Sequence, residues 1–174
     1  MDRFEKFFFE KRYPLLTQLI KKNTFLLTLF KMLYYGLPIM IAAAYIVYVI
    51  HRFRAYGKRT LLKTVGVPAA AYIGLSVFRR LVNFKRPYEK FDYIPILGNY
   101  KKGKSMPSRH TFSAGIIGAV ISSDYPMLAP FTWIAVAMVA LTRLLAGVHH
   151  IRDLAVSVGL SLAVSFMLKI PVKN

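Results

Sequence analysis

The feature that most constrains this chain is a series of five apolar stretches without formal charge. They cover residues 32–50, 64–78, 111–123, 125–142 and 154–168. The first stretch has 19 residues, close to the roughly 20 that an α-helix needs to cross the ~30 Å hydrocarbon core of a bilayer. The second and the fifth lengthen when apolar neighbours and the stems of flanking lysines are included. The pattern predicts an all-α, polytopic membrane helix bundle with about five transmembrane helices.

The composition agrees with this interpretation. The chain has 174 residues, of which 56% are hydrophobic, and its formal net charge is +18. On a soluble chain such a charge favours nucleic-acid binding, but on so apolar a chain it indicates basic loops beside membrane spans. We therefore expect membrane lipids as partners and no nucleic acid. The absence of cysteine excludes a disulfide scaffold and a thiolate zinc site.

Residues 1–31 differ from the rest, because charged residues interrupt them too often for a span. Phenylalanines and leucines alternate there with lysines and arginines, as in an amphipathic helix that lies in the headgroup plane of a membrane. We expect this segment to be interfacial and residues 32–174 to form a membrane-embedded domain. The one long connection in that domain, residues 83–109, contains several prolines and glycines and is expected to be an active-site loop.

Three polar clusters lie at the ends of the expected spans. In chain order they are Arg79 with Arg86-Pro87, then Pro107-Ser108-Arg109-His110, then Thr142-Arg143 with His149 and Asp153. Successive spans cross a membrane in opposite directions, so the end of the second span and the start of the third lie on one side. The end of the fourth and the start of the fifth lie on that same side. The sequence therefore predicts one site built from all three clusters.

The residue types in these clusters suit phosphoryl transfer. Guanidinium groups bind phosphate oxygens as fixed forks, and the start of the third span adds free backbone N–H groups. The expected phosphate ligands are Arg79, Arg86, Ser108, Arg109 and Arg143. His149 and Asp153 are four residues apart, within reach on one helix face. We expect His149 to be the nucleophile, Asp153 to orient it, and His110 to be the general acid.

The spacing of the clusters resembles the type 2 phosphatidic acid phosphatase superfamily, which includes bacterial acid phosphatases and vanadium haloperoxidases. That family carries Lys, six residues and Arg-Pro, then Pro-Ser-Gly-His, then Ser-Arg, five residues, His, three residues and Asp. The resemblance covers roughly residues 60–168. It implies a phosphohistidine at His149, no metal or other cofactor, lipid phosphate substrates, and an active site that faces away from the cytoplasm.

Three positions depart from the family pattern. Arg79 stands for Lys, which keeps the charge but changes the reach of the side chain, and Thr142 stands for Ser. Arg109 stands for Gly, which is the largest departure because glycine lets a backbone approach phosphate closely. The side chain of an arginine at this position either points away from the expected phosphate site or adds a fourth cation to it.

We expect a bacterial phosphatase that hydrolyses a phosphomonoester or a terminal diphosphate of a membrane lipid. The candidate substrates are phosphatidic acid, phosphatidylglycerophosphate and a polyprenyl diphosphate. Among the seven acidic residues only Asp153 lies in the clusters, whereas a two-metal phosphatase needs several converging ligands. The sequence therefore predicts a metal-independent enzyme, and it leaves the oligomeric state open.

Two other functions fit parts of the pattern. A membrane protein that binds anionic lipids without catalysis would result if Arg109 impairs the site. A transport or channel subunit would need charged residues in mid-span, and the five stretches lack them.

Charge alone leaves the orientation open. Residues 51–63 and the tail with Lys169 and Lys173 are basic, as in cytoplasmic segments. The expected active-site loop holds more cations still, but a phosphate site needs cations on whichever side it faces. We expect a multi-pass protein of the cell membrane with its site on the extracytoplasmic side.

Several residues near the clusters fit simpler roles. Lys101, Lys102 and Lys104 suit either steering of an anionic headgroup or a solvated surface. His150 and Arg152 are expected to face lipid headgroups, and Tyr34 to be a packing or interface aromatic.

Overall fold

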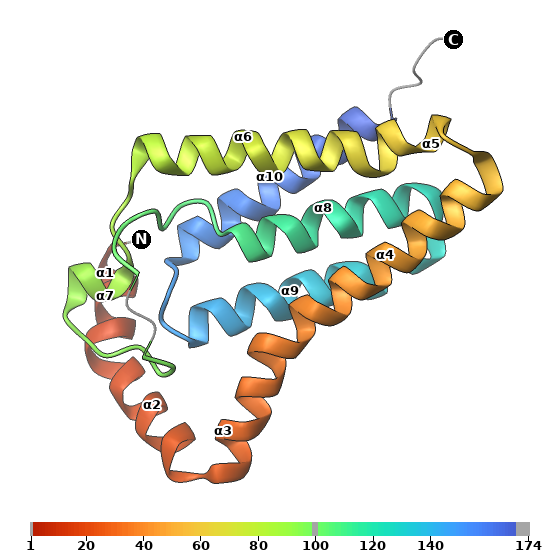
Figure 1. The fold of residues 1–174 in the computed structure, drawn as a ribbon. Coiled ribbons are helices and arrows are strands. Elements are labelled where there is room, and N and C mark those ends of the chain that lie inside the picture. Colours follow the sequence, from red (N-terminus) through yellow and green to blue (C-terminus); the bar gives the residue numbers. More distant parts are fainter. Residues whose placement is uncertain (1, 99–100, 170–174) are drawn as a thin grey trace.

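The computed structural model describes residues 2–98 and 101–169, and this part of the chain is helical without any strand (Figure 1). The elements are α1 (Asp2–Phe7), η1 (Phe8–Arg12), α2 (Tyr13–Lys22), α3 (Thr24–Lys31), η2 (Met32–Gly36), α4 (Leu37–Tyr56), α5 (Arg59–Leu61), η3 (Leu62–Gly66), α6 (Val67–Val82), α7 (Pro87–Phe91), α8 (Arg109–Asp124), η4 (Pro126–Leu128), α9 (Ala129–Leu145) and α10 (Ile151–Lys169). Residues 99–100 of the expected active-site loop and the basic Lys173 lie outside the described residues.

The first break in the N-terminal helices falls at Asn23. Its backbone is extended, and its side chain accepts a hydrogen bond from the N–H of Leu26 at 3.1 Å, which caps α3. From there α3, η2 and α4 follow without interruption over Thr24–Tyr56. Residues 24–31 therefore continue into the first long helix, and the division of the chain near residue 31 stays a prediction.

Helix α8 occupies the centre of the bundle. It packs against α4, α6, α9 and α10, and Figure 1 shows α6, α8, α9 and α10 running alongside one another. The contact with α10 is especially close at Gly115, where a Cβ atom would overlap the side chain of Ser161. Small residues let helix backbones approach in this way. The chain therefore builds its core around a helix that is covered on most sides.

Four helix ends meet at one end of the bundle. Figure 1 shows the end of α6, the start of α8, the end of α9 and the start of α10 together there, as the alternation of spans predicts. The opposite end is held by Asp124, whose carboxylate accepts from Lys63 at 2.9 Å and from Tyr48 Oη at 2.7 Å and forms an ion pair with Arg52 at 3.0 Å. The three polar clusters therefore lie at the end of the bundle opposite to the contacts of Asp124.

Three helical stretches in the described residues are long and apolar enough to cross a membrane: Thr24–Tyr56, Arg59–Phe91 and Pro126–Leu145. They contain the first and second expected spans, and all of the fourth except Tyr125. The third and fifth coincide with α8, which has 16 residues, and with α10. The chain is therefore an all-helical membrane protein, and the number of five transmembrane helices stays a prediction.

Candidate active site

A cavity of about 70 Å³, here called the site pocket, lies where the four helix ends meet. Its lining residues are Tyr34, Arg79, Arg86, Lys101, Arg109, His110, Arg143, Val148 and His149. Six of the eight predicted site residues are among them. The other two are Ser108 and Asp153, and both are fully buried beside the pocket.

Asp153 lies behind His149. Its Oδ2 atom is 3.4 Å from Nδ1 of His149, and it also accepts hydrogen bonds from Oγ of Ser105 and from the backbone N–H of His150. An ionised carboxylate can only accept, so Nδ1 of His149 carries the proton. Nε2 is then the ring nitrogen that keeps a lone pair.

The charge state of His149 follows from its surroundings. Burial lowers the pKa of His149 to about 4, because desolvation disfavours the imidazolium. The hydrogen bond to Asp153 raises this pKa, and the nearby charge of Arg86 lowers it further. Since burial is the largest of these effects, the imidazole is neutral at pH 7, which is the state that a nucleophile requires.

Arg79 and Arg86 hold the loop that forms one wall of the site pocket. Arg79 donates to three backbone carbonyls and Arg86 to two. These carbonyls belong to Gly103, Lys104, Ser105, Pro107 and Val148. A guanidinium has five N–H donors, so both side chains are fixed by the loop and still keep donors for an anion.

Arg143 enters the pocket from the end of α9. Its guanidinium carbon lies 3.7 Å from the centre of the Tyr34 ring, and it donates to the carbonyl of Tyr34 at 2.8 Å. Its Nε is buried without a partner among the described residues. Tyr34 thus fixes a predicted phosphate ligand and lines the pocket itself, a role beyond the packing expected from the sequence.

Ser108 occupies the N-cap position of α8, and its side chain makes no hydrogen bond to the backbone N–H groups of the first turn. Its Oγ accepts from Thr111 at 3.2 Å, and its N–H donates to Ser157 at 2.7 Å. The next two residues, Arg109 and His110, reach the pocket. The first N–H groups of a helix have no intrahelical partner, so the start of α8 adds a positive dipole end beside the pocket.

The N-terminal helices dock onto the loop that carries His149. Glu5, which is 1% exposed, accepts from Nδ1 of His150 at 3.0 Å and from the N–H of Ile151 at 3.2 Å. Tyr13 donates to the carbonyl of Ala146 at 2.8 Å. The expectation that His150 faces lipid headgroups is therefore wrong, because His150 is 1% exposed and is held by Glu5.

An apolar groove leads away from the site pocket. Its first part, a cavity of about 230 Å³, shares Arg109 and His110 with the pocket. Its second part, also about 230 Å³, shares Tyr72, Ser113 and Ile117 with the first. The site pocket and the two parts of the groove therefore lie next to one another along α8, and each shares lining residues with the next.

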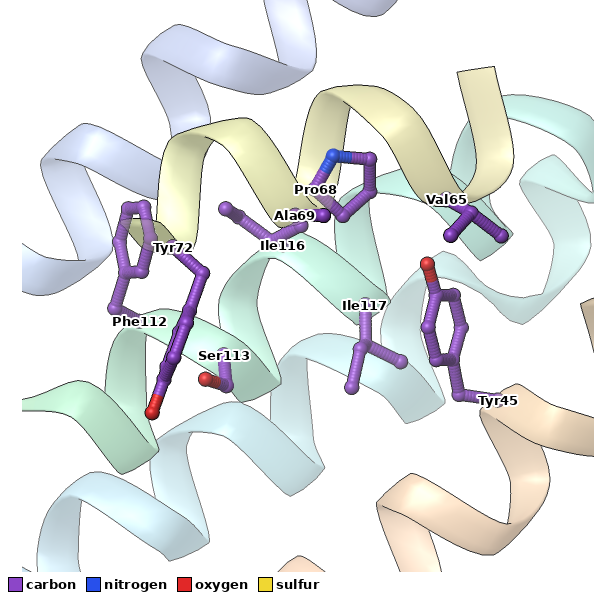
Figure 2. A pocket seen from close by; sticks show the side chains of 9 residues that line it. All are labelled: Tyr45, Val65, Pro68, Ala69, Tyr72, Phe112, Ser113, Ile116 and Ile117. Carbon is purple, nitrogen blue, oxygen red and sulfur yellow. The ribbon is translucent and has the colours of Figure 1, made fainter. Parts of the chain in front are cut away.

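Figure 2 shows the second part of the apolar groove between α4, α6 and α8. Tyr72 and Phe112 lie at the end nearer the site, and Tyr45 and Val65 lie at the far end. Its other lining residues are Pro68, Ala69, Ser113, Ile116 and Ile117. This second part of the groove is thus almost entirely apolar, whereas the site pocket that adjoins the groove is cationic.

The comparisons with known proteins agree with this geometry. The family model of the PAP2 superfamily matches residues 60–173, more than half of the chain. The chain belongs to the PAP2 superfamily. The resemblance found in the three clusters is therefore confirmed.

A solved structure extends the agreement to the fold. The transmembrane PAP2-type phosphatidylglycerolphosphate phosphatase from Bacillus subtilis superposes with a TM-score of 0.60 at 16% sequence identity. The match covers 93% of this chain and 95% of that one, so it includes the helices before residue 60. No match was found among curated proteins.

Several residues that lie at the site in the structure are not part of the three PAP2 sequence clusters. Ser105 bonds to Asp153, Tyr34 stacks on Arg143, and Glu5 holds the loop of His149. No spacing rule in the sequence points to them, because each partner lies 48 or more residues away. Lys101, which the sequence left undecided, lines the site pocket.

The donor set of this PAP2 site contains few metal ligands. Within residues 2–98 and 101–169, no three His, Asp or Glu side chains form a group that could hold a metal ion. The site is instead rich in guanidinium groups, a residue type that can bind phosphate oxygens.

Proposed function

We propose that this protein is a lipid phosphate phosphatase that works through a phosphohistidine. The observation that carries the proposal is the apolar groove along α8, which adjoins the cationic site pocket and shares Arg109 and His110 with it. A phosphate head in the pocket would leave a lipid tail in the groove. Membership of the PAP2 superfamily supports the phosphatase activity.

The residues suggest a two-step reaction. Nε2 of His149 attacks phosphorus in line with the leaving oxygen, a P–N bond forms, and the P–O bond breaks. Burial and the charge of Arg143 lower the pKa of His110 to about 4. The negative charge of the substrate phosphate would raise this pKa, so that His110 can give its proton to the leaving oxygen. Asp153 stabilises the positive imidazole through Nδ1–H, while Arg79, Arg86 and Arg143 stabilise the equatorial oxygens. Water then hydrolyses the phosphohistidine and releases inorganic phosphate.

Phosphate release from purified protein in detergent tests the proposal. We expect the wild type to release phosphate from at least one lipid phosphate and His149→Ala to release none above background. His51→Ala is a matched control, because His51 is exposed at the far end of α4. Equal release by wild type and His149→Ala would refute the nucleophile. No release by wild type would favour a non-catalytic lipid-binding protein, the outcome in which Arg109 impairs the site.

Metal independence is part of the same proposal. The many guanidinium groups and the scarcity of carboxylates in the pocket support it. We expect a chelator to leave the activity unchanged and vanadate, which mimics pentavalent phosphorus, to inhibit it. Loss of activity with chelator and its return with an added divalent cation would contradict the metal-free mechanism.

A further inference from the structure

A second cavity with a cationic lining adjoins the site pocket. It has a volume of about 290 Å³ and is lined by Ser76, Gly103 and seven Lys or Arg side chains. It shares four cations with the site pocket: Arg79, Arg86, Lys101 and Arg109. It adds three of its own: Arg80, Lys102 and Lys104. We call it the cationic cavity.

No carboxylate among the described residues lines the cationic cavity. Glu89, the acidic residue bonded to the cavity wall, is occupied: its Oε2 accepts from the N–H groups of Arg86 and Gly103 at 2.7 and 2.8 Å. Seven like charges around one space repel each other, and an anion inside would relieve that repulsion. Oγ of Ser76 is buried without a partner among the described residues and is a further donor on this wall.

The wall between the two cavities is built from guanidinium groups. Arg79 and Arg86 line both cavities. Arg79 donates to loop carbonyls through Nη1 and Nη2, and Arg86 does so through Nε and Nη1, so each of the five-donor guanidinium groups keeps further N–H groups. Their remaining N–H groups can serve anions on either side. Two anionic groups would therefore lie on opposite sides of one pair of side chains, as two phosphates of a single headgroup can.

We propose that the cationic cavity is a subsite for a second phosphate of the substrate. The inference rests on the proposed function and narrows it: the preferred substrate carries two phosphates in its headgroup. These can be a diphosphate, or a phosphomonoester joined to a phosphodiester. Phosphatidic acid, with one phosphate, leaves the cationic cavity empty and binds more weakly.

Steady-state kinetics in a nonionic detergent test the inference with three lipids of equal acyl chains: phosphatidic acid, diacylglycerol diphosphate and phosphatidylglycerophosphate. The variant is Arg80→Ala with Lys102→Ala, whose side chains line the cationic cavity but not the site pocket. The control is Lys21→Ala with Lys22→Ala, an equal loss of charge at exposed positions of α2.

We expect the wild type to show a lower KM for the two-phosphate lipids. The variant should raise that KM by about tenfold or more, the scale of one lost charge-assisted contact, and leave phosphatidic acid within about twofold of wild type. Whichever of diacylglycerol diphosphate and phosphatidylglycerophosphate has the lower KM identifies the spacing that the subsite fits. The control should follow the wild type for all three lipids.

Two outcomes would overturn the inference. If the variant changes the kinetics of all three lipids equally, the cavity only steers anions in general. If it changes none, the cavity is a solvated surface. In both cases phosphatidic acid is still hydrolysed, which separates failure of this inference from failure of the proposed function, where no lipid releases phosphate.

Discussion

At the scale of single residues, His149 is subject to opposing influences. Its burial lowers the pKa of the ring, whereas Asp153 behind it raises that pKa. Burial prevails, so the pKa of about 4 lies below the usual value of 6.5. The imidazole thus keeps its lone pair under mildly acidic conditions while Asp153 still orients it.

This shift predicts the pH dependence of the first chemical step. Protonation of Nε2 abolishes the nucleophile, and since the pKa is lowered, the loss should begin well below pH 6.5 rather than at it. We expect the rate of phosphoenzyme formation, corrected for the substrate phosphate whose pKa is about 6, to hold down to roughly pH 5. Rapid-quench measurement of acid-labile, protein-bound phosphate checks this. An acid limb centred at or above pH 6.5 would contradict the assignment.

The sequence predicts some of these residues better than others. Arg79, Arg86, His110 and His149 lie in motifs with fixed spacing, and the structure brings them to one pocket. Tyr34 lies in no motif, because its contact with Arg143 is made across 109 residues of sequence. Spacing predicts residues on one element, but partners from distant elements appear only once the helices pack.

At the scale of elements, the N-terminal helices have a buried face that the amphipathic pattern of the sequence does not assign to a partner. Phe9, Tyr13 and Glu5 lie on one face, and all three are 1% exposed or less. Phe9 stacks on Tyr93 with ring centres 5.3 Å apart. This face docks on the site loops rather than on headgroups alone. An amphipathic sequence shows that one face is apolar but not which surface covers it.

Glu5 therefore acts as a positioning residue for the His149 loop. We expect Glu5→Ala to lower kcat by about tenfold or more with a smaller change in KM, because a loop displaced by even ~1 Å misaligns the nucleophile. Glu5→Gln keeps an acceptor for the N–H of Ile151 and should recover part of kcat. Glu10→Ala, an exposed carboxylate on the neighbouring turn, is the matched control. Unchanged kcat in Glu5→Ala would show that the docking has no part in turnover.

The contact between α8 and α10 gives a second prediction at this scale. Gly115→Ala would place a methyl group against Ser161, and overpacking of this kind costs about 1–3 kcal/mol. We expect a lower Tm in detergent. Gly74→Ala in α6 is the control, because its Cβ would meet no atom within 4 Å. If both variants melt alike, the close approach of α8 and α10 is not a source of stability.

A second change sharpens this test. Gly115→Ala combined with Ser161→Gly removes the side chain that the methyl group would strike. The double variant should recover part of the lost Tm, less the loss of the Ser161 hydrogen bonds to Phe112 and Ser157. A double variant no more stable than Gly115→Ala would mean that the helices are separated by something other than this clash.

At the scale of the whole molecule, the sequence predicts the helical class and the side of the bundle where the clusters meet, but not the number of spans. Hydropathy identifies helices that face lipid, such as Thr24–Tyr56 and Pro126–Leu145. Helix α8 is covered by its neighbours. Because they pack closely, it carries small residues such as Gly115 and Gly118 where a lipid-facing helix would carry long apolar side chains. A central helix is therefore the least visible one in a hydropathy profile.

The orientation of the whole molecule gives the last prediction. The chain has no cysteine, so single cysteines can report which end of the bundle faces outward. The two variants are Lys85→Cys and Lys58→Cys. Lys85 follows α6 at the site end of the bundle, and Lys58 lies between α4 and α5 at the opposite end (Figure 1). Both lysines are exposed and neither lines the site pocket.

If the site is extracytoplasmic, a membrane-impermeant maleimide should label Lys85→Cys in intact cells and label Lys58→Cys only after permeabilisation. The wild type should take up no label in either state, and both variants should keep their phosphatase activity. The reverse labelling would place the site in the cytoplasm. The cations around the pocket would then lie on the cytoplasmic side. In that case the positive-inside rule, applied with the site loop included, would predict the orientation correctly.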